Sequence, residues 1–171
     1  MAIYATSVKT ARLLFIILLV SICATGISHA KNPPDSIDAI RAILPDSTAL
    51  DGKVVYVDFW ASWCVPCRHS FPWMQDLYER YRQKGFEIVA VGVDKDHKAA
   101  LKFLGDIDPS FTVVFDSTGD LAKRYGLDAM PTSFVYGRDG RLALQNRGFR
   151  QEETDSLDRT ISRLLNERTS K

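Results

Sequence analysis

The sequence predicts an α/β fold in which a mixed central sheet carries helices on both faces. Apolar runs of β-favouring residues alternate with segments that have helical spacing, and this alternation is typical of parallel strands joined by crossover helices. A hairpin and one last amphipathic helix follow, and the hairpin adds antiparallel strands. The chain of 171 residues is 46% hydrophobic, which is enough for one domain with a sizeable core.

The amino-terminal half of this alternation centres on one buried strand and one long helix. Apolar residues at helical spacing over 36–44, behind Ser36 or Asp35 as a cap, predict a first helix. The near-continuous apolar run 54–60 predicts a strand that is buried on both faces. A long helix is expected over 65–84.

Prolines and a glycine mark positions along that long helix. Pro66 suits its first turn, Pro72 is expected to kink it, and Gly85 ends it.

Arg138-Asp139-Gly140-Arg141 is the turn of the hairpin. Further strands are expected over 86–93, 111–115, 132–136 and 142–147, and further helices over 95–105, 119–125 and 152–167.

Residues 1–30 have the pattern of a secretory signal peptide, which leaves 31–171 as one domain. Lys9 and Arg12 form a basic flank, an apolar core follows, and Ser28-His29-Ala30 is a small-x-small cleavage site. We therefore expect a cleaved, periplasmic protein. The alternative is an uncleaved membrane anchor, although the apolar run of about 15 residues is shorter than the roughly 20 that a spanning helix needs.

The charge balance does not favour a nucleic-acid partner. The chain has 22 basic and 21 acidic residues, so its formal net charge is +1. A chain with so small a net charge has no strong positive electrostatic field to attract phosphate groups. Contact with a membrane is expected only through the signal segment, if that segment is not cleaved.

Cys64-Val65-Pro66-Cys67 is the motif that carries chemistry. Two cysteines three residues apart at a helix start can form and open a disulfide without moving the backbone. The first sulfur lies at the positive end of the helix, which favours a thiolate and makes Cys64 a nucleophile. We expect an exposed Cys64 to attack a partner disulfide and a shielded Cys67 to resolve the mixed disulfide. Pro66 stiffens this turn, and Val65 adds apolar surface beside the nucleophile.

Other uses of the cysteine pair fit the sequence less well. A zinc site needs a second pair of ligands, and His69 and His97 stand alone. Haem attachment needs a histidine directly after the second cysteine, where Arg68 stands instead. A purely structural disulfide across so short a loop would constrain little of the unfolded chain. We therefore expect no metal, and no cofactor other than the redox-active disulfide itself.

Several stretches of the chain resemble the thioredoxins. The segment 58–67 is similar to their active-site segment, with Asp58 six residues before the first cysteine. Pro72 lies five residues after the second cysteine, where thioredoxins kink this helix, and Ala129-Met130-Pro131-Thr132 resembles their cis-proline loop. The resemblance covers about residues 50–166 and implies a thioredoxin-like three-layer sandwich.

Three features narrow the resemblance to one group within the thioredoxin family. An inserted helix and strand, the signal segment and the start Trp-Ala-Ser-Trp-Cys are similar to the TlpA/ResA/CcmG group of exported thioredoxin-like proteins. The resemblance implies a periplasmic thiol:disulfide oxidoreductase that reduces protein disulfides and is recharged by a membrane electron carrier of the DsbD type. Within this class, a dedicated role as a reductant in cytochrome c maturation stays open.

The residues around the pair also have expected roles. Asp58 lies on a strand that is apolar on both sides, so it is expected to be buried, with a raised pKa, and to take the proton from Cys67 during resolution. The resemblance implies a cis bond before Pro131, which would let Met130 offer its backbone to an extended substrate segment. The substrate groove is expected to include Trp63, Val65, Pro66, Met130 and Pro131.

Two rival functions remain to be weighed. A redox-inert thioredoxin-like binding or chaperone module would use the groove around Met130 and Trp63, but it would need neither the two cysteines nor Asp58. A thiol peroxidase needs a threonine two to three residues before a lone reactive cysteine, and Ala61-Ser62-Trp63 does not supply one.

Overall fold

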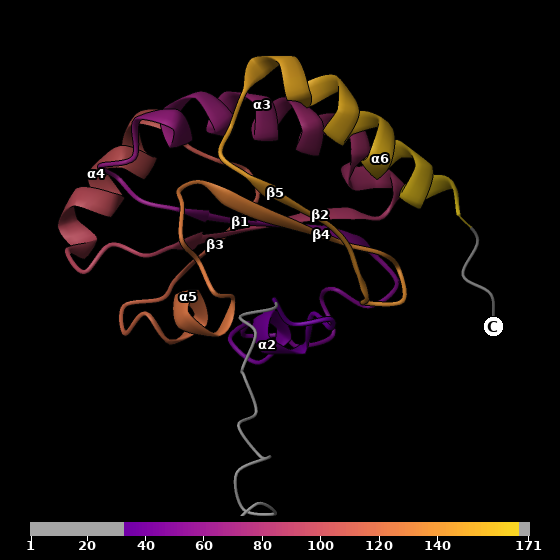
Figure 1. Ribbon diagram of the computed structural model, residues 1–171, viewed down its shortest axis with the longest axis horizontal. Coiled ribbons are helices and arrows are strands. Elements are labelled where there is room, and N and C mark those ends of the chain that lie inside the picture. Colours follow the sequence, from indigo (N-terminus) through magenta and orange to yellow (C-terminus); the bar gives the residue numbers. More distant parts are fainter. Residues whose placement is uncertain (1–32, 168–171) are drawn as a thin grey trace, which may run out of the picture. The chain divides into compact units, whose positions relative to one another are not determined.

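The computed structural model describes residues 33–167, which form a five-stranded sheet with helices on both faces (Figure 1). The signal segment predicted over 1–30 lies outside the described residues. The strands are β1 (Val54–Trp60), β2 (Phe86–Gly92), β3 (Thr112–Phe115), β4 (Thr132–Tyr136) and β5 (Leu142–Arg147). The helices are α2 (Asp38–Arg41), α3 (Val65–Tyr81), α4 (His97–Ile107), α5 (Asp120–Arg124) and α6 (Thr154–Asn166), with short 3₁₀ helices η1 (Arg82–Lys84) and η2 (Gln151–Glu153).

The sheet is mixed, as the sequence predicts. Its strand order is β3-β2-β1-β4-β5. β1 runs parallel to β2, and β2 to β3, whereas β4 is antiparallel to both β1 and β5. The predicted α/β fold is therefore confirmed. Because β1, β2 and β3 are parallel, their carboxyl ends meet at one edge of the sheet, which we call the carboxyl edge.

Two apolar layers cover the faces of this sheet. Alternate residues of β1 point to opposite faces, so Tyr56 and Trp60 pack with α3, α4 and α6, whereas Val57 and Phe59 pack with α2 and α5. Figure 1 shows α3 and α6 on one side of the sheet, with α2 and α5 on the other. By the same alternation, Asp58 faces the α3 side. Every residue of β1, β2 and β4 is buried, which accounts for the continuous apolar runs in the sequence.

The long helix begins at its predicted residue and ends slightly early. Cys64 is the N-cap of α3, Pro66 lies in the first turn, and the helix continues through Pro72. The chain then tightens into η1, and Gly85 ends this run with a left-handed φ of 82°.

The helix predicted over 36–44 is wrong in length. The helix α2 covers four residues and has Ile37 at its N-cap position, while the hydroxyl of Ser36, one residue earlier, accepts the Asp38 N–H over 3.3 Å. Ser36 also forms an isolated antiparallel bridge with Arg141 of the hairpin, so the chain is still extended at this point. Pro45 disfavours a helical conformation at the residue before it, which limits the helix at its other end.

One arginine joins three distant segments at the edge opposite the carboxyl edge. The guanidinium of Arg138 donates hydrogen bonds to the carbonyls of Gly52 (2.8 Å), Lys84 (2.8 Å) and Leu165 (2.9 Å). Arg138→Ala is expected to lower the free energy of unfolding by about 2–4 kcal/mol, because these bonds involve a charged donor. Urea denaturation measures this loss. Arg141→Ala removes an exposed arginine from the same turn and should change stability by less than about 0.5 kcal/mol; equal losses would contradict the assignment.

Candidate active site

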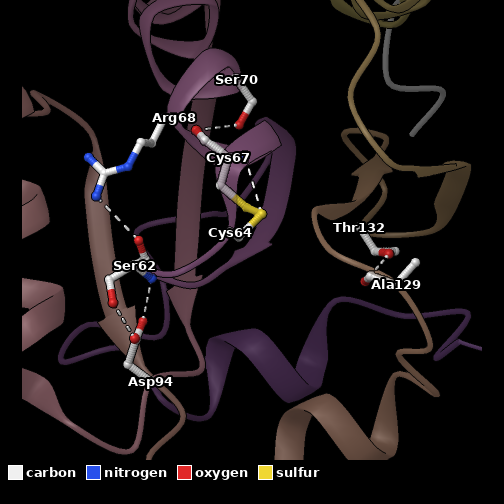
Figure 2. Close-up of a disulfide and its surroundings, with 8 residues drawn as sticks. All are labelled: Ser62, Cys64, Cys67, Arg68, Ser70, Asp94, Ala129 and Thr132. Atoms are coloured by element: carbon white, nitrogen blue, oxygen red, sulfur yellow. Dashed lines mark hydrogen bonds between the residues drawn. A yellow bond between two sulfur atoms is a disulfide. The ribbon is translucent and has the colours of Figure 1, made fainter.

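The two cysteines form a disulfide at the start of α3 (Figure 2). Cys64 has an extended backbone as the N-cap, and Cys67 lies in the first helical turn. Their Cα atoms are 5.3 Å apart. The backbone N–H of Cys67 donates to the Cys64 sulfur over 3.2 Å, so one free donor of the helix start points at this sulfur. The spacing in the sequence thus becomes a disulfide at a helix N-terminus.

The disulfide is less accessible than the sequence suggests. The expectation that Cys64 is exposed is wrong for this oxidised form, in which Cys64 is 3% exposed and Cys67 is fully buried. The reason is geometric, because the Cys64 sulfur turns back over the first helical turn towards Cys67. The exposed side chains are its neighbours, Trp63 at 68% and Val65 at 66%. The surface beside the disulfide is therefore largely apolar, and Pro66 is exposed there as well.

Asp58 lies inside the protein on the α3 face of β1. It is 1% exposed, and its pairing partners are Ala90 on β2 and Ser133 on β4. Among the described residues, its Oδ2 atom has no hydrogen-bond partner. Burial raises the pKa of this carboxyl well above its ordinary value, so Asp58 holds a proton at pH values where an exposed aspartate is ionised.

Tyr56, which the sequence places only within a predicted strand, is a buried polar neighbour of Asp58. It is 2% exposed, and its ring packs edge-on against Trp73 at 5.8 Å between centroids. Burial raises the pKa of the Tyr56 hydroxyl, the charge of Asp58 raises it further, and a hydrogen bond with Ser133 opposes both. Its place two residues before Asp58, on the same face, was a signal that could have found it.

The loop before β4 carries the predicted cis-proline. The Met130–Pro131 peptide bond is cis, Pro131 is buried, and Met130 is half-buried. Met130 packs against the apolar cluster that contains both cysteines. The Thr132 hydroxyl donates to the carbonyl of Ala129 over 2.9 Å, which closes the loop (Figure 2). In the described part of the chain, the backbone of Met130 makes no hydrogen bond to other backbone groups.

A second set of residues at the carboxyl edge was not found from the sequence. The carboxylate of Asp94 accepts hydrogen bonds from the Ser62 backbone N–H (2.8 Å) and the Ser62 hydroxyl (2.6 Å). The Arg68 guanidinium donates to the Ser62 carbonyl over 3.4 Å. Figure 2 shows these three side chains beside the disulfide. The signal for Asp94 was its place directly after a buried strand parallel to β1, where the strand ends meet.

Neither a metal site nor a membrane span is found within residues 33–167. No group of three or more histidine, cysteine, aspartate or glutamate side chains there could hold a metal ion. No helix of that region is long and apolar enough to cross a membrane.

The fold and this site together define a thioredoxin-fold protein with a disulfide at the head of one helix. A family model described as Redoxin matches residues 44–161. The chain therefore belongs to the Redoxin family, and the predicted thioredoxin-like fold and family resemblance are confirmed.

Two relatives of this chain are named thiol-disulfide oxidoreductases. The chain is 37% identical over 102 residues to Thiol-disulfide oxidoreductase ResA of Bacillus thuringiensis subsp. konkukian, a match that covers 60% of this chain and 59% of that protein. This match therefore spans less than two thirds of the relative's length. Identity to Thiol-disulfide oxidoreductase ResA of Bacillus subtilis is 32% over 151 residues, covering 78% of this chain and 84% of that protein.

A solved structure shares the fold at higher identity. It is the crystal structure of a Chlorobium tepidum protein described as a candidate thiol:disulfide interchange protein DsbE. The two chains are 45% identical, with a TM-score of 0.68, over 70% of this chain and 84% of the other.

Proposed function

We propose that this protein is a periplasmic thiol:disulfide oxidoreductase that reduces disulfides in other proteins through Cys64 and Cys67. The observation that carries the proposal is the disulfide at the start of α3, in which the Cys67 N–H donates to the Cys64 sulfur. A helix N-terminus and a directed N–H favour a thiolate at Cys64 once the disulfide is reduced. The names of the relatives support the same class of reaction.

In the first step, the Cys64 thiolate attacks one sulfur of a partner disulfide. A sulfur–sulfur bond forms between Cys64 and the partner, the partner's own disulfide breaks, and its second sulfur leaves as a thiolate that takes up a proton. The exposed Trp63 and Val65 contact the partner beside this bond. The backbone of Met130 pairs with an extended segment of the partner in the manner of an added strand.

In the second step, Cys67 resolves the mixed disulfide. Its thiol must lose a proton before it attacks the Cys64 sulfur, and ionised Asp58 is the group that accepts this proton. The raised pKa of Asp58, caused by burial, brings its proton affinity closer to that of a thiol. The second partner sulfur leaves as a thiolate that takes up a proton from the solvent, and the Cys64–Cys67 disulfide forms. The partner has then gained two electrons and two protons, and the Cys67 proton is on Asp58.

The cycle uses no cofactor besides this disulfide, and a membrane electron carrier of the DsbD type supplies the electrons that reopen it. Export through residues 1–30 would bring the protein to the compartment of such partners. A redox-inert binding module is less well supported, because it would not need a cysteine pair at a helix start or a buried acid nearby.

Trapping of mixed disulfides tests this proposal. The Cys67→Ser variant should accumulate in cells as disulfide-linked complexes with other proteins, because Cys64 attacks but nothing resolves the product. Non-reducing electrophoresis should show these complexes, and a reductant should release them. The Cys64→Ser/Cys67→Ser double variant is the matched control and should give none. A Cys67→Ser protein that stays free of partners would contradict the two-step reaction.

A further inference from the structure

Ser62 is the residue that fixes the turn between β1 and α3. All three of its polar groups are engaged, because its N–H and hydroxyl both donate to Asp94 and its carbonyl accepts from Arg68. Ser62 lies two residues before Cys64, whose own N–H donates to the carbonyl of Ala61 over 3.1 Å. The turn that carries the nucleophile is therefore attached to the end of β2 and to the first turn of α3.

The attachment extends to the inserted helix α4. The Arg68 guanidinium lies over the ring of Phe103 on α4, 4.8 Å from its centroid. Phe103 stacks on Trp60 at 4.9 Å and meets Phe71 edge-on at 5.1 Å. Trp60 ends β1 and Phe71 belongs to α3, so the two elements on either side of the turn both pack against Phe103.

We propose that Asp94 and Arg68 are positioning residues that hold the turn of Cys64 through Ser62 and place opposite charges on its two sides. We call Asp94, Ser62 and Arg68 the Ser62 clamp. The proposal deepens the proposed function and rests on it, since it assigns residues that set the reactivity of the same nucleophile.

The two charges act on the Cys64 thiolate with opposite signs. The carboxylate of Asp94 disfavours a second negative charge nearby, whereas the guanidinium of Arg68 favours it. Asp94 is 4% exposed and Arg68 is exposed, so solvent screens the influence of Asp94 less. A purely structural clamp would change only the stability of the fold or the mobility of the turn. If the two charges also act on Cys64, removing the charge of Asp94 must make the Cys64 thiol more acidic, and removing the charge of Arg68 must make it less acidic.

The test measures the alkylation rate at Cys64 against pH in the reduced protein, followed by mass spectrometry. Asp94→Asn should raise the acid dissociation constant of the Cys64 thiol about threefold or more, and Arg68→Met should lower it about twofold or more. Asp58 and His69 are unchanged in both variants, so their contributions cancel.

Two matched controls each remove a charge of the same sign from a residue outside the Ser62 clamp. Asp116→Asn neutralises another buried carboxylate, which accepts the Ala122 N–H over 2.8 Å, and Arg82→Met neutralises an exposed arginine just beyond the far end of α3. Both should leave the acid dissociation constant of Cys64 within about 1.5-fold of the wild type. Shifts in Asp94→Asn and Arg68→Met no larger than these, or of the same sign, would overturn the proposal.

Ser62→Ala separates the effect of the hydroxyl hydrogen bond on turnover from the effect of the two charges on Cys64. It removes the 2.6 Å bond without changing any charge, so it should slow the reduction of a protein disulfide several-fold while ionisation of Cys64 shifts less than in Asp94→Asn. Unchanged turnover in Ser62→Ala would remove the positioning role. If the wild type fails to reduce insulin but the charge variants shift Cys64 as expected, the proposed function fails and the clamp stands.

Discussion

Replacing Cys64 by serine is expected to lower the rate of insulin disulfide reduction to the background of the chemical reductant, at least about a thousandfold below the wild-type contribution. A serine hydroxyl is not ionised near neutral pH and cannot form a disulfide with the partner. The turbidity of precipitating insulin chains, with dithiothreitol as electron source, measures the rate.

Two further variants test whether this loss of activity is specific to Cys64. Cys67→Ser should also lose multiple turnover, but a single equivalent of partner thiol should still be released, because Cys64 completes the first step. Ser70→Ala alters a buried neighbour whose hydroxyl donates to the Cys67 carbonyl over 3.1 Å, and it should keep most of the activity. A Cys64→Ser protein that retains substantial activity would show that Cys64 is not the attacking residue.

The second large effect concerns Asp58 and the pH dependence of stability. The folded protein keeps the Asp58 proton to a higher pH than the unfolded chain does, because burial raises the pKa of this carboxyl. Between the unfolded value near about 3.9 and the raised folded value, the native state binds more protons than the unfolded state. The contribution of Asp58 to the stability of the wild type is therefore fully present below the unfolded pKa and is lost as pH rises through this window.

Asp58→Asn removes this titration and is expected to be more stable than the wild type near neutral pH. The difference should grow with pH by up to about 1.4 kcal/mol per pH unit inside the window. Urea denaturation of the oxidised proteins from pH 4 to pH 9 measures it, since disulfide-bonded cysteines do not titrate.

Asp116→Asn is the matched control for this measurement. The Asp116 carboxylate accepts a backbone hydrogen bond, whereas the Oδ2 atom of Asp58 has no hydrogen-bond partner within residues 33–167. Asp116→Asn should therefore be less stable than the wild type at pH 7. A stability gain in Asp58→Asn that is constant across pH would contradict a buried carboxyl with a raised pKa. In reduction assays, Asp58→Asn should slow release of the mixed disulfide, because Cys67 loses its proton acceptor.

Strands were easier to predict than helix ends because their signal is local. The bounds of β1 and β4 are those the β-favouring runs predict, since both strands are buried along their whole length. The bounds of β5 are predicted as the return strand of the hairpin, although this strand is only partly buried. Helix α2 was overestimated because a β-bridge between Ser36 and Arg141 competes for its first residues, and such a long-range contact leaves no mark on the local pattern. The start of α4 differs for a local reason, because Asp96 caps the helix by accepting the Lys98 N–H over 2.9 Å, so the helix begins at His97.

The site was predictable where a motif defines it and not where the fold assembles it. The spacing of Cys64 and Cys67 and the apolar surroundings of Asp58 lie in short stretches of sequence. The contact between Asp94 and Ser62 spans 32 residues and depends on β1 and β2 being neighbours in register. The burial of Cys64 depends on a side-chain rotation that sequence spacing does not contain.

The three hydrogen bonds of Arg138 have a consequence for the proposed catalytic cycle. They hold the amino ends of β1 and β2 and the end of α6 together, at the edge of the sheet farthest from the cysteines. The disulfide, in contrast, closes a loop of only four residues, so it restricts the unfolded chain very little. In the proposed cycle, the bond that breaks and re-forms therefore contributes less to the stability of the domain than a disulfide across a long loop would, and the contacts of Arg138 stay in place while it opens.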